Sequence, residues 1–180
     1  MKTKLLSLFS MLIFATMVNA QSTMFNSQSV KHESEQHVIV CFFSATGNTR
    51  MAAKRLAAEH NARLWDIPAM EPYTEADLDW RDSTSRSSLE MKDPNERPII
   101  RECTNIEACD TVYLGFPIWW GICPRIINSW IDNNILDDKV IIPFATSGSS
   151  PIEPAVEYLR KTYPNVKFED GILLNDYLKK

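Results

Sequence analysis

Apolar and polar positions form blocks that repeat along the chain from about residue 37 onward. Continuous apolar runs predict five strands, over residues 38–43, 62–67, 111–116, 139–145 and 166–174. Apolar residues at helical spacing predict helices over residues 49–59, 124–131 and 152–161. Strands that are apolar throughout and alternate with helices favour a doubly wound α/β fold, in which a parallel sheet is covered by helices on both faces.

Residues 68–98 interrupt this rhythm. They contain four prolines, many charged residues and the hydroxyl-rich segment 83–88, without a clear period. We expect a long excursion on the surface there, with a short helix near Leu89. Loops of this length in compact domains are often functional.

The first twenty residues have the three parts of a secretory signal peptide. Two lysines are followed by the apolar run 5–18 and by a Val-Asn-Ala sequence that ends at Ala20. The apolar run is shorter than the ~20 residues that a membrane-spanning helix needs. Gln21 stands where a lipoprotein would have its lipidated cysteine. We therefore expect cleavage near Ala20 and no membrane span in the mature chain.

Two further segments follow this leader. Residues 21–36 are polar and lack periodicity, so we predict a flexible tether. The expected organisation is a signal peptide over 1–20, the tether over 21–36 and one folded domain over 37–180. Such a protein would be exported, and either periplasmic or secreted.

The charge of the chain limits its partners. It has 19 basic and 23 acidic side chains and a net charge of −4. Removal of a leader that contains Lys2 and Lys4 makes the charge more negative by two. An acidic domain without a Lys/Arg cluster is a poor partner for phosphate backbones, so nucleic-acid binding is not expected. A protein steered to this chain by charge should present a basic docking face.

The loop after the first predicted strand is suited to an anion. In doubly wound sheets, ligands bind beyond the carboxyl ends of the strands. Residues 44–49, Ser-Ala-Thr-Gly-Asn-Thr, lead directly into a predicted helix, whose first N–H groups could hold a phosphate. The loop has one glycine and no lysine, which excludes the Walker and the dinucleotide types. The alternative is a simple capping turn, in which Thr46 or Thr49 caps the helix.

Two tryptophans lie in the loop after the third predicted strand. Trp119 and Trp120 stand between Pro117 and Gly121, so a flat ligand could stack there. Because adjacent residues of an extended segment point in opposite directions, we expect one indole to pack on the protein and the other to remain free. The alternative is that both belong to the core. The loop 145–150 after the fourth strand offers further small donors beside the same site.

Together these loops resemble a known family. Residues 44–49 after an apolar strand resemble the phosphate loop of flavodoxins, and residues 115–125 with Thr146-Ser147-Gly148 are similar to flavodoxin-like proteins of short chain length. The resemblance spans about residues 37–174. It implies a flavodoxin-like, five-stranded parallel sheet in the order 2-1-3-4-5 and FMN as the cofactor.

The same resemblance implies which residues bind FMN. The implied phosphate ligands are in the first loop: Ser44, Ala45, Thr46, Gly47, Asn48 and Thr49. The implied ring contacts are Pro117, Ile118, Trp119, Trp120 and Gly121, with Ser147 and Gly148 at the ring edge. Tyr73 and Trp80 are weaker assignments for the other face of the ring.

Three functions are compatible with these observations. The first is an FMN-binding electron carrier in the cell envelope that docks to a redox partner protein and needs no catalytic side chain. The second is an FMN-dependent NAD(P)H reductase that acts on a quinone or another small acceptor. The third is a cofactor-free exported binding module. The two FMN-binding functions are favoured over the cofactor-free module, because all three loops have small donors, glycines or aromatic residues.

Other reactive residues carry less information. The histidines are scattered, so no metal site is expected. Cys103 and Cys109 could form a disulfide in an oxidising compartment, although spacing alone does not establish one.

Overall fold

The computed structural model describes residues 37–178, which form one compact unit. The predicted signal peptide, its cleavage site near Ala20 and the tether over 21–36 lie outside the described residues.

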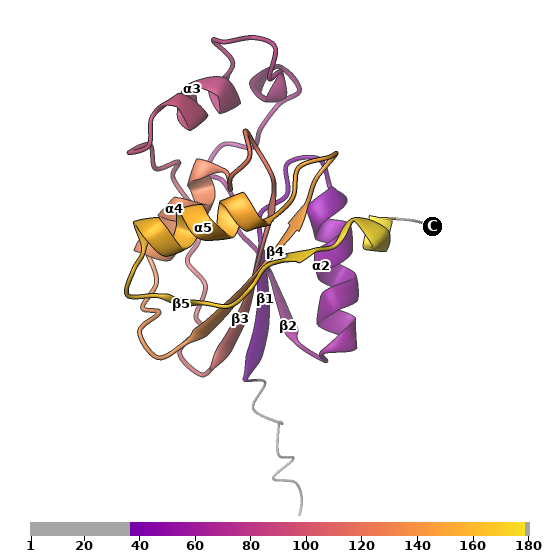
Figure 1. Cartoon of the computed structure of the whole chain (residues 1–180), viewed down its shortest axis with the longest axis vertical. Helices are drawn as coiled ribbons and strands as arrows, with labels where there is room; N and C mark the ends of the chain where they lie inside the picture. Colours follow the sequence, from indigo (N-terminus) through magenta and orange to yellow (C-terminus); the bar gives the residue numbers. More distant parts are fainter. Residues whose placement is uncertain (1–36, 179–180) are drawn as a thin grey trace, which may run out of the picture. The chain divides into compact units, whose positions relative to one another are not determined.

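A parallel sheet is the centre of this unit (Figure 1). Its strands are β1 (Val38–Phe42), β2 (Arg63–Asp66), β3 (Thr111–Pro117), β4 (Val140–Thr146), β5 (Lys167–Phe168) and β6 (Ile172–Leu173). They pair in the order β2-β1-β3-β4-β5, and β6 also pairs with β4. The predicted fold class and strand order are confirmed.

Helices cover both faces of the sheet, as predicted (Figure 1). The helices are α2 (Asn48–Glu59), α3 (Arg86–Lys92), α4 (Arg125–Asp132) and α5 (Glu153–Thr162), with short 3-10 turns η1 (Ala76–Leu78) and η2 (Asn175–Leu178). α2 and η2 pack on one face, whereas α4 and α5 pack on the other. None of the helices described between residues 37 and 178 is long and apolar enough to cross a membrane.

Alternation along the strands divides the core into these two layers. In β1, Ile39 and Cys41 pack in the cluster that contains α4 and α5, whereas Val40 and Phe42 pack against α2. Each fully buried large apolar side chain contributes about 1.5–3 kcal/mol. The central strands are therefore fixed in register from both faces.

The last predicted strand, over 166–174, is wrong in one respect, because it divides into β5 and β6. Gly171 lies between them and comes close to α5. A Cβ there would meet Val156 Cγ2 at 2.7 Å and Ile152 Cδ1 at 2.8 Å. The chain therefore bends between two short pairings with β4.

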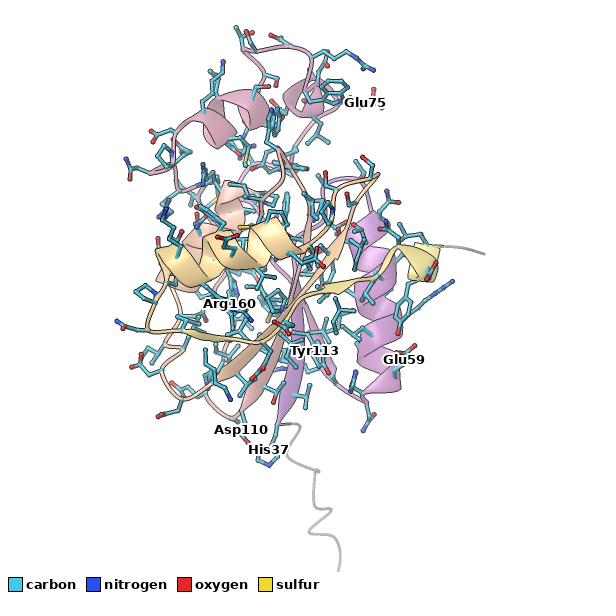
Figure 2. All side chains as sticks on the ribbon, viewed as in Figure 1. His37, Glu59, Glu75, Asp110, Tyr113 and Arg160 are labelled. Carbon is cyan, nitrogen blue, oxygen red and sulfur yellow. The ribbon has the colours of Figure 1, made fainter. Side chains whose placement is uncertain are left out.

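The excursion expected over 68–98 is present and extends to residue 101; it lies over the carboxyl ends of the strands (Figure 1). Its two ends are joined by the bonds from Met70 N–H to Ile99 O (2.8 Å) and from Arg101 N–H to Pro68 O (2.9 Å). The predicted helix near Leu89 is α3. In Figure 2, Glu75 marks the excursion, whereas His37 and Asp110 mark the opposite, amino end of the sheet.

Candidate functional site

The loop from Ser44 to Asn48 places the start of α2 at the carboxyl edge of the sheet. Gly47 is the N-cap residue and has a φ of +93°, a conformation that favours glycine. Its N–H donates to Ser44 Oγ at 3.1 Å, and its carbonyl accepts from Met51 N–H at 3.0 Å. No side chain caps the helix.

The start of α2 therefore presents free donors. The N–H groups of Asn48, Thr49 and Arg50 have no intrahelical partner by position, and no other bond satisfies them within residues 37–178. The Thr49 hydroxyl, which could have capped the helix, is instead hydrogen-bonded to the Thr146 hydroxyl at 2.8 Å. The simple capping turn is thus wrong, and the geometry suits an anion.

The charge of Arg50, beside this loop, is compensated by a carboxylate. Arg50 forms an ion pair with Asp66 of β2. An anion at the start of α2 would therefore be held mainly by neutral N–H groups and hydroxyls.

The tryptophan loop after β3 is a tight hairpin. Trp119 N–H donates to Ile122 O at 2.9 Å, and Ile122 N–H donates to Trp119 O at 3.0 Å. The two residues between them have positive φ, +47° for Trp120 and +85° for Gly121, as a two-residue hairpin turn requires. A tryptophan in this conformation is strained, by about 1–2 kcal/mol.

The two indoles point to different surroundings, as predicted. Trp119 forms edge contacts with Phe43 and Tyr73, with ring centroids 5.8 and 5.5 Å apart. Trp120 is 53% exposed. The strained turn therefore holds a large aromatic ring at the surface of the site.

The loop from Ser44 to Asn48, which we call the anion loop, meets the tryptophan loop in one cavity of about 370 Å³. We call this cavity the aromatic cavity. This volume is within the usual range for ligand sites, roughly 300–1,000 Å³. The cavity is lined by Ala45, Thr46, Thr49, Leu78, Trp80, Ser87, Pro117, Ile118, Trp119 and Trp120. The aromatic cavity thus brings predicted phosphate ligands and predicted ring contacts together, and Trp80 of the excursion also lines it.

A second cavity, of about 450 Å³, adjoins the same loop. Its lining includes Ser44, Gly47, Arg50, Asp66 and Arg101. It also includes Tyr73, which lies against Trp119 rather than in the aromatic cavity. The anion loop therefore separates a charged cavity from an aromatic one.

Four predicted ligands, Asn48, Gly121, Ser147 and Gly148, do not line either cavity. The Ser147 hydroxyl accepts from the N–H groups of Ser149 and Ser150, at 3.2 and 2.8 Å. Its backbone N–H and carbonyl are paired with the Asn175 amide, at 2.9 and 2.8 Å. The roles of these residues in ligand binding stay predictions.

Leu78 and Ser87 are site residues that the sequence did not indicate. Ser87 is one of several hydroxyl residues in an aperiodic segment, and Leu78 is an isolated apolar residue. No local pattern distinguishes either of them. Only the folding of the excursion over the sheet places them at the cavity.

A partly buried polar cluster holds the excursion together. Tyr73 OH donates to Glu90 Oε2 at 2.6 Å, and Arg86 Nε donates to Glu90 Oε1 at 2.7 Å. The Arg86 guanidinium also lies 4.0 Å from the centre of the Tyr73 ring. Burial, together with the bond to Glu90, raises the pKa of Tyr73 above its usual range.

Arg125 of α4 attaches this excursion to the sheet domain. It is only 4% exposed, and it donates to the carbonyls of Glu90 (3.4 Å) and Met91 (3.1 Å) at the end of α3. It also donates to Tyr158 OH at 2.6 Å. One buried guanidinium thus joins α3, α4 and α5.

All four cysteines lie within the described part of the chain, and none of them forms a disulfide. The disulfide considered between Cys103 and Cys109 is therefore not formed. Burial raises the pKa of the Cys123 thiol to about 12 and that of Cys41 above its usual range, so neither is a ready nucleophile. Residues 37–178 contain no group of three or more His, Cys, Asp or Glu residues placed to hold a metal ion.

The fold and the site define a class of protein. A doubly wound sheet with an uncapped helix start beside an aromatic cavity, both at the carboxyl edge, is typical of α/β proteins that bind a phosphorylated planar ligand. A family model described as Flavodoxin matches residues 37–180. The chain belongs to the flavodoxin family.

Solved structures agree with this assignment. A proposed flavoprotein from Bacteroides eggerthii DSM 20697 is 47% identical, with 77% of this chain and 87% of that chain covered and a TM-score of 0.76. A proposed flavoprotein from Bacteroides uniformis ATCC 8492 is 43% identical and has a TM-score of 0.75, with 79% of this chain and 94% of that chain covered.

A more distant structure shares the fold. It is a flavoprotein in complex with FMN from Lactobacillus acidophilus NCFM. It is 16% identical and has a TM-score of 0.63, with 77% of this chain and 93% of that chain covered. A comparison with curated proteins finds no match.

Proposed function

We propose that this protein is an FMN-binding electron carrier that is exported to the cell envelope. The observation that carries the proposal is the aromatic cavity, which is lined at one end by the uncapped start of α2 and elsewhere by two exposed tryptophans. FMN has a phosphate for the first and a planar ring for the second. The FMN complex of the distant Lactobacillus acidophilus flavoprotein agrees with this choice of ligand.

The residues present fit the cofactor. The N–H groups of Asn48, Thr49 and Arg50, with the Thr46 hydroxyl, would bind the phosphate. Trp120 and Trp80, which are 53% and 64% exposed, would cover the ring. Bound FMN would supply the electron-transfer chemistry, and the protein would bind, orient and shield it.

The carrier role is supported by the surroundings of the cavity. Residues 71–82, which bear Trp80, contain five acidic side chains and one basic side chain. Such a surface would steer a basic redox partner toward the exposed ring edge.

The first experiment measures FMN binding through tryptophan fluorescence of the full chain, with riboflavin as the ligand that lacks the phosphate. We expect saturable quenching by FMN and much weaker binding of riboflavin. The variant Trp120→Leu should weaken FMN binding. Ile135→Ala, at an exposed apolar residue outside both cavities, is the matched control and should leave it unchanged. Absence of FMN binding would refute the proposal.

A second experiment separates the carrier from the reductase. Steady-state turnover with NADPH and a quinone should not exceed that of free FMN if the protein is a carrier. Reduction of cytochrome c, a basic protein, by the reduced flavoprotein should slow as salt is added. At low salt, cytochrome c reduction by Glu75→Lys should be slower than by the unchanged protein, because the variant reverses a charge on the acidic segment.

Export is tested separately by the mass of the protein recovered from expressing cells. A mature N-terminus at Gln21 in the envelope or medium is expected. A full-length chain that stays in the cytoplasm would contradict this part of the proposal and leave FMN binding unaffected.

A further inference from the structure

An unpaired hydroxyl is buried in the wall of the aromatic cavity. Ser87 is 2% exposed and lines this cavity. Its Oγ has no hydrogen-bond partner within residues 37–178. A buried hydroxyl without a partner destabilises a protein, so a ligand that can pair with it gains that contact.

The start of α3 does not explain this serine. Ser85 is the N-cap residue, and its Oγ accepts from the Ser88 N–H at 3.3 Å. The Ser85 hydroxyl also bonds the Ser88 hydroxyl at 2.9 Å. The two neighbouring serines therefore satisfy each other, and Ser87 has no role in the cap.

The position of α3 assigns Ser87 to the aromatic end of the cavity. The next residue, Ser88, lines a smaller cavity of about 210 Å³ together with Met91, Trp80 and Trp120. No residue of the anion loop lines that smaller cavity. The first turn of α3 thus lies beside the two tryptophans, where the ring would bind.

We propose that the Ser87 hydroxyl is a hydrogen-bond partner of the polar edge of the flavin ring, an inference that rests on the proposed function. This edge has ring nitrogens and carbonyl oxygens that accept and one N–H that donates, and a serine hydroxyl can match either kind. Stacking on tryptophan leaves a ring free to turn in its plane. A directional bond at the edge would fix its orientation.

The test compares Ser87→Ala with the matched control Thr104→Val in the full chain, with FMN as the ligand. Thr104 is another buried residue whose hydroxyl has no hydrogen-bond partner within residues 37–178, and it lies outside the aromatic cavity. Ser87→Ala should weaken FMN binding roughly three- to tenfold. It should also shift the visible absorption bands of bound FMN, which respond to hydrogen bonds at the ring. Without FMN, the variant should unfold at the same or a higher temperature than the unchanged protein, because an unpaired hydroxyl is removed. Thr104→Val should alter neither the affinity nor the spectrum, because Thr104 lines neither the aromatic cavity nor the charged cavity beside it.

Each other outcome has a distinct meaning. Unchanged affinity and spectrum in Ser87→Ala would overturn the inference and leave the proposed function intact. Weaker binding with an unchanged spectrum would place the contact away from the ring and would also overturn it. Failure of the unchanged protein to bind FMN would refute the proposed function itself. Ser87→Cys repeats the test if Ser87→Ala does not fold, because a thiol is close to the hydroxyl in shape but forms only weak hydrogen bonds.

Discussion

The candidate site is built from two regions that are held in place differently. The loops after β1 and β3 continue from buried strands and are joined at β4, through the Thr49 to Thr146 hydroxyl bond (2.8 Å) and the bond from Ile118 N–H to Thr146 O (3.0 Å). The excursion 68–101 does not extend the parallel sheet. Its position depends on the cluster around Glu90 and on Arg125.

Because of this difference, one wall of the site can open while the rest of the site stays folded. The two loops should persist as long as the sheet is folded. The excursion can open locally when a few side-chain contacts are lost, because local stability follows the local contacts. The wall formed by Trp80 and Ser87 is therefore expected to be the more easily opened side of the aromatic cavity.

The largest effect is expected from Gly115→Ala in β3. A Cβ there would lie 2.1 Å from Phe144 Cζ, and the Phe144 ring is fully buried. We expect a loss of about 3 kcal/mol in the free energy of unfolding, measured by urea denaturation. Gly148→Ala, which has open space around its Cβ, is the control and should change stability little. Similar losses of stability from the two substitutions would show that the close packing of Gly115 against Phe144 does not stabilise the sheet.

Arg125→Ala should affect the excursion more than the sheet. It removes the donor to the Glu90 and Met91 carbonyls and to Tyr158 OH, with a local cost of about 2 kcal/mol. Hydrogen exchange of the Leu89 N–H, which donates to Ser85 O at 2.9 Å, should become about 30-fold faster.

The strand amides provide the internal comparison for Arg125→Ala. Their exchange should change much less than that of α3. Arg160→Ala, which removes a guanidinium bonded outside the excursion, should leave α3 protected. Equal acceleration in strands and α3 would mean that the two regions unfold together.

Trp120→Gly should separate strain from binding. Glycine accepts the φ of +47° that strains the tryptophan, so the free energy of unfolding should rise by up to about 1 kcal/mol. FMN affinity should fall about tenfold, because a stacking contact is lost. Denaturation without ligand and FMN titration measure the two effects. A loss of stability would argue against strain at this turn.

The smallest expected effect is a loss of stability of the excursion at acid pH. Hydrogen bonds from Thr74 to Asp77 and from Thr84 to Asp82 lower the pKa of both carboxyl groups. A lowered pKa in the folded state stabilises it above the unfolded value of about 3.9, and this contribution is lost as the pH falls below that value.

Asp82 is exposed and Asp77 is partly exposed, so the effect should be modest. Cleavage of the excursion by pepsin, measured relative to cleavage of an unfolded substrate at the same pH, should become faster as the pH falls below about 3.9. In the double variant Asp77→Asn, Asp82→Asn, this pH dependence should be reduced. An unchanged pH dependence would exclude these two groups as its source.

The sequence by itself determined the parts of the protein that depend on neighbouring residues. Apolar blocks indicated the strands of a doubly wound sheet, and the short polar side chains around Gly47 indicated an open helix start. The Trp119-Trp120 pair indicated one indole packed on the protein and one free, and in the hairpin Trp119 is partly buried whereas Trp120 is exposed. In each case, the deciding residues lie within a few positions of one another.

Only the tertiary structure decided which residues complete the cavity. Trp80 and Ser87 reach Trp120 because the excursion folds over the sheet and Arg125 holds α3 there. The division of the last strand depends on the close approach of Gly171 to α5. These contacts join residues far apart in the chain, and their free energy comes from burial and from buried hydrogen bonds. Local periodicity carries no signal for such contacts.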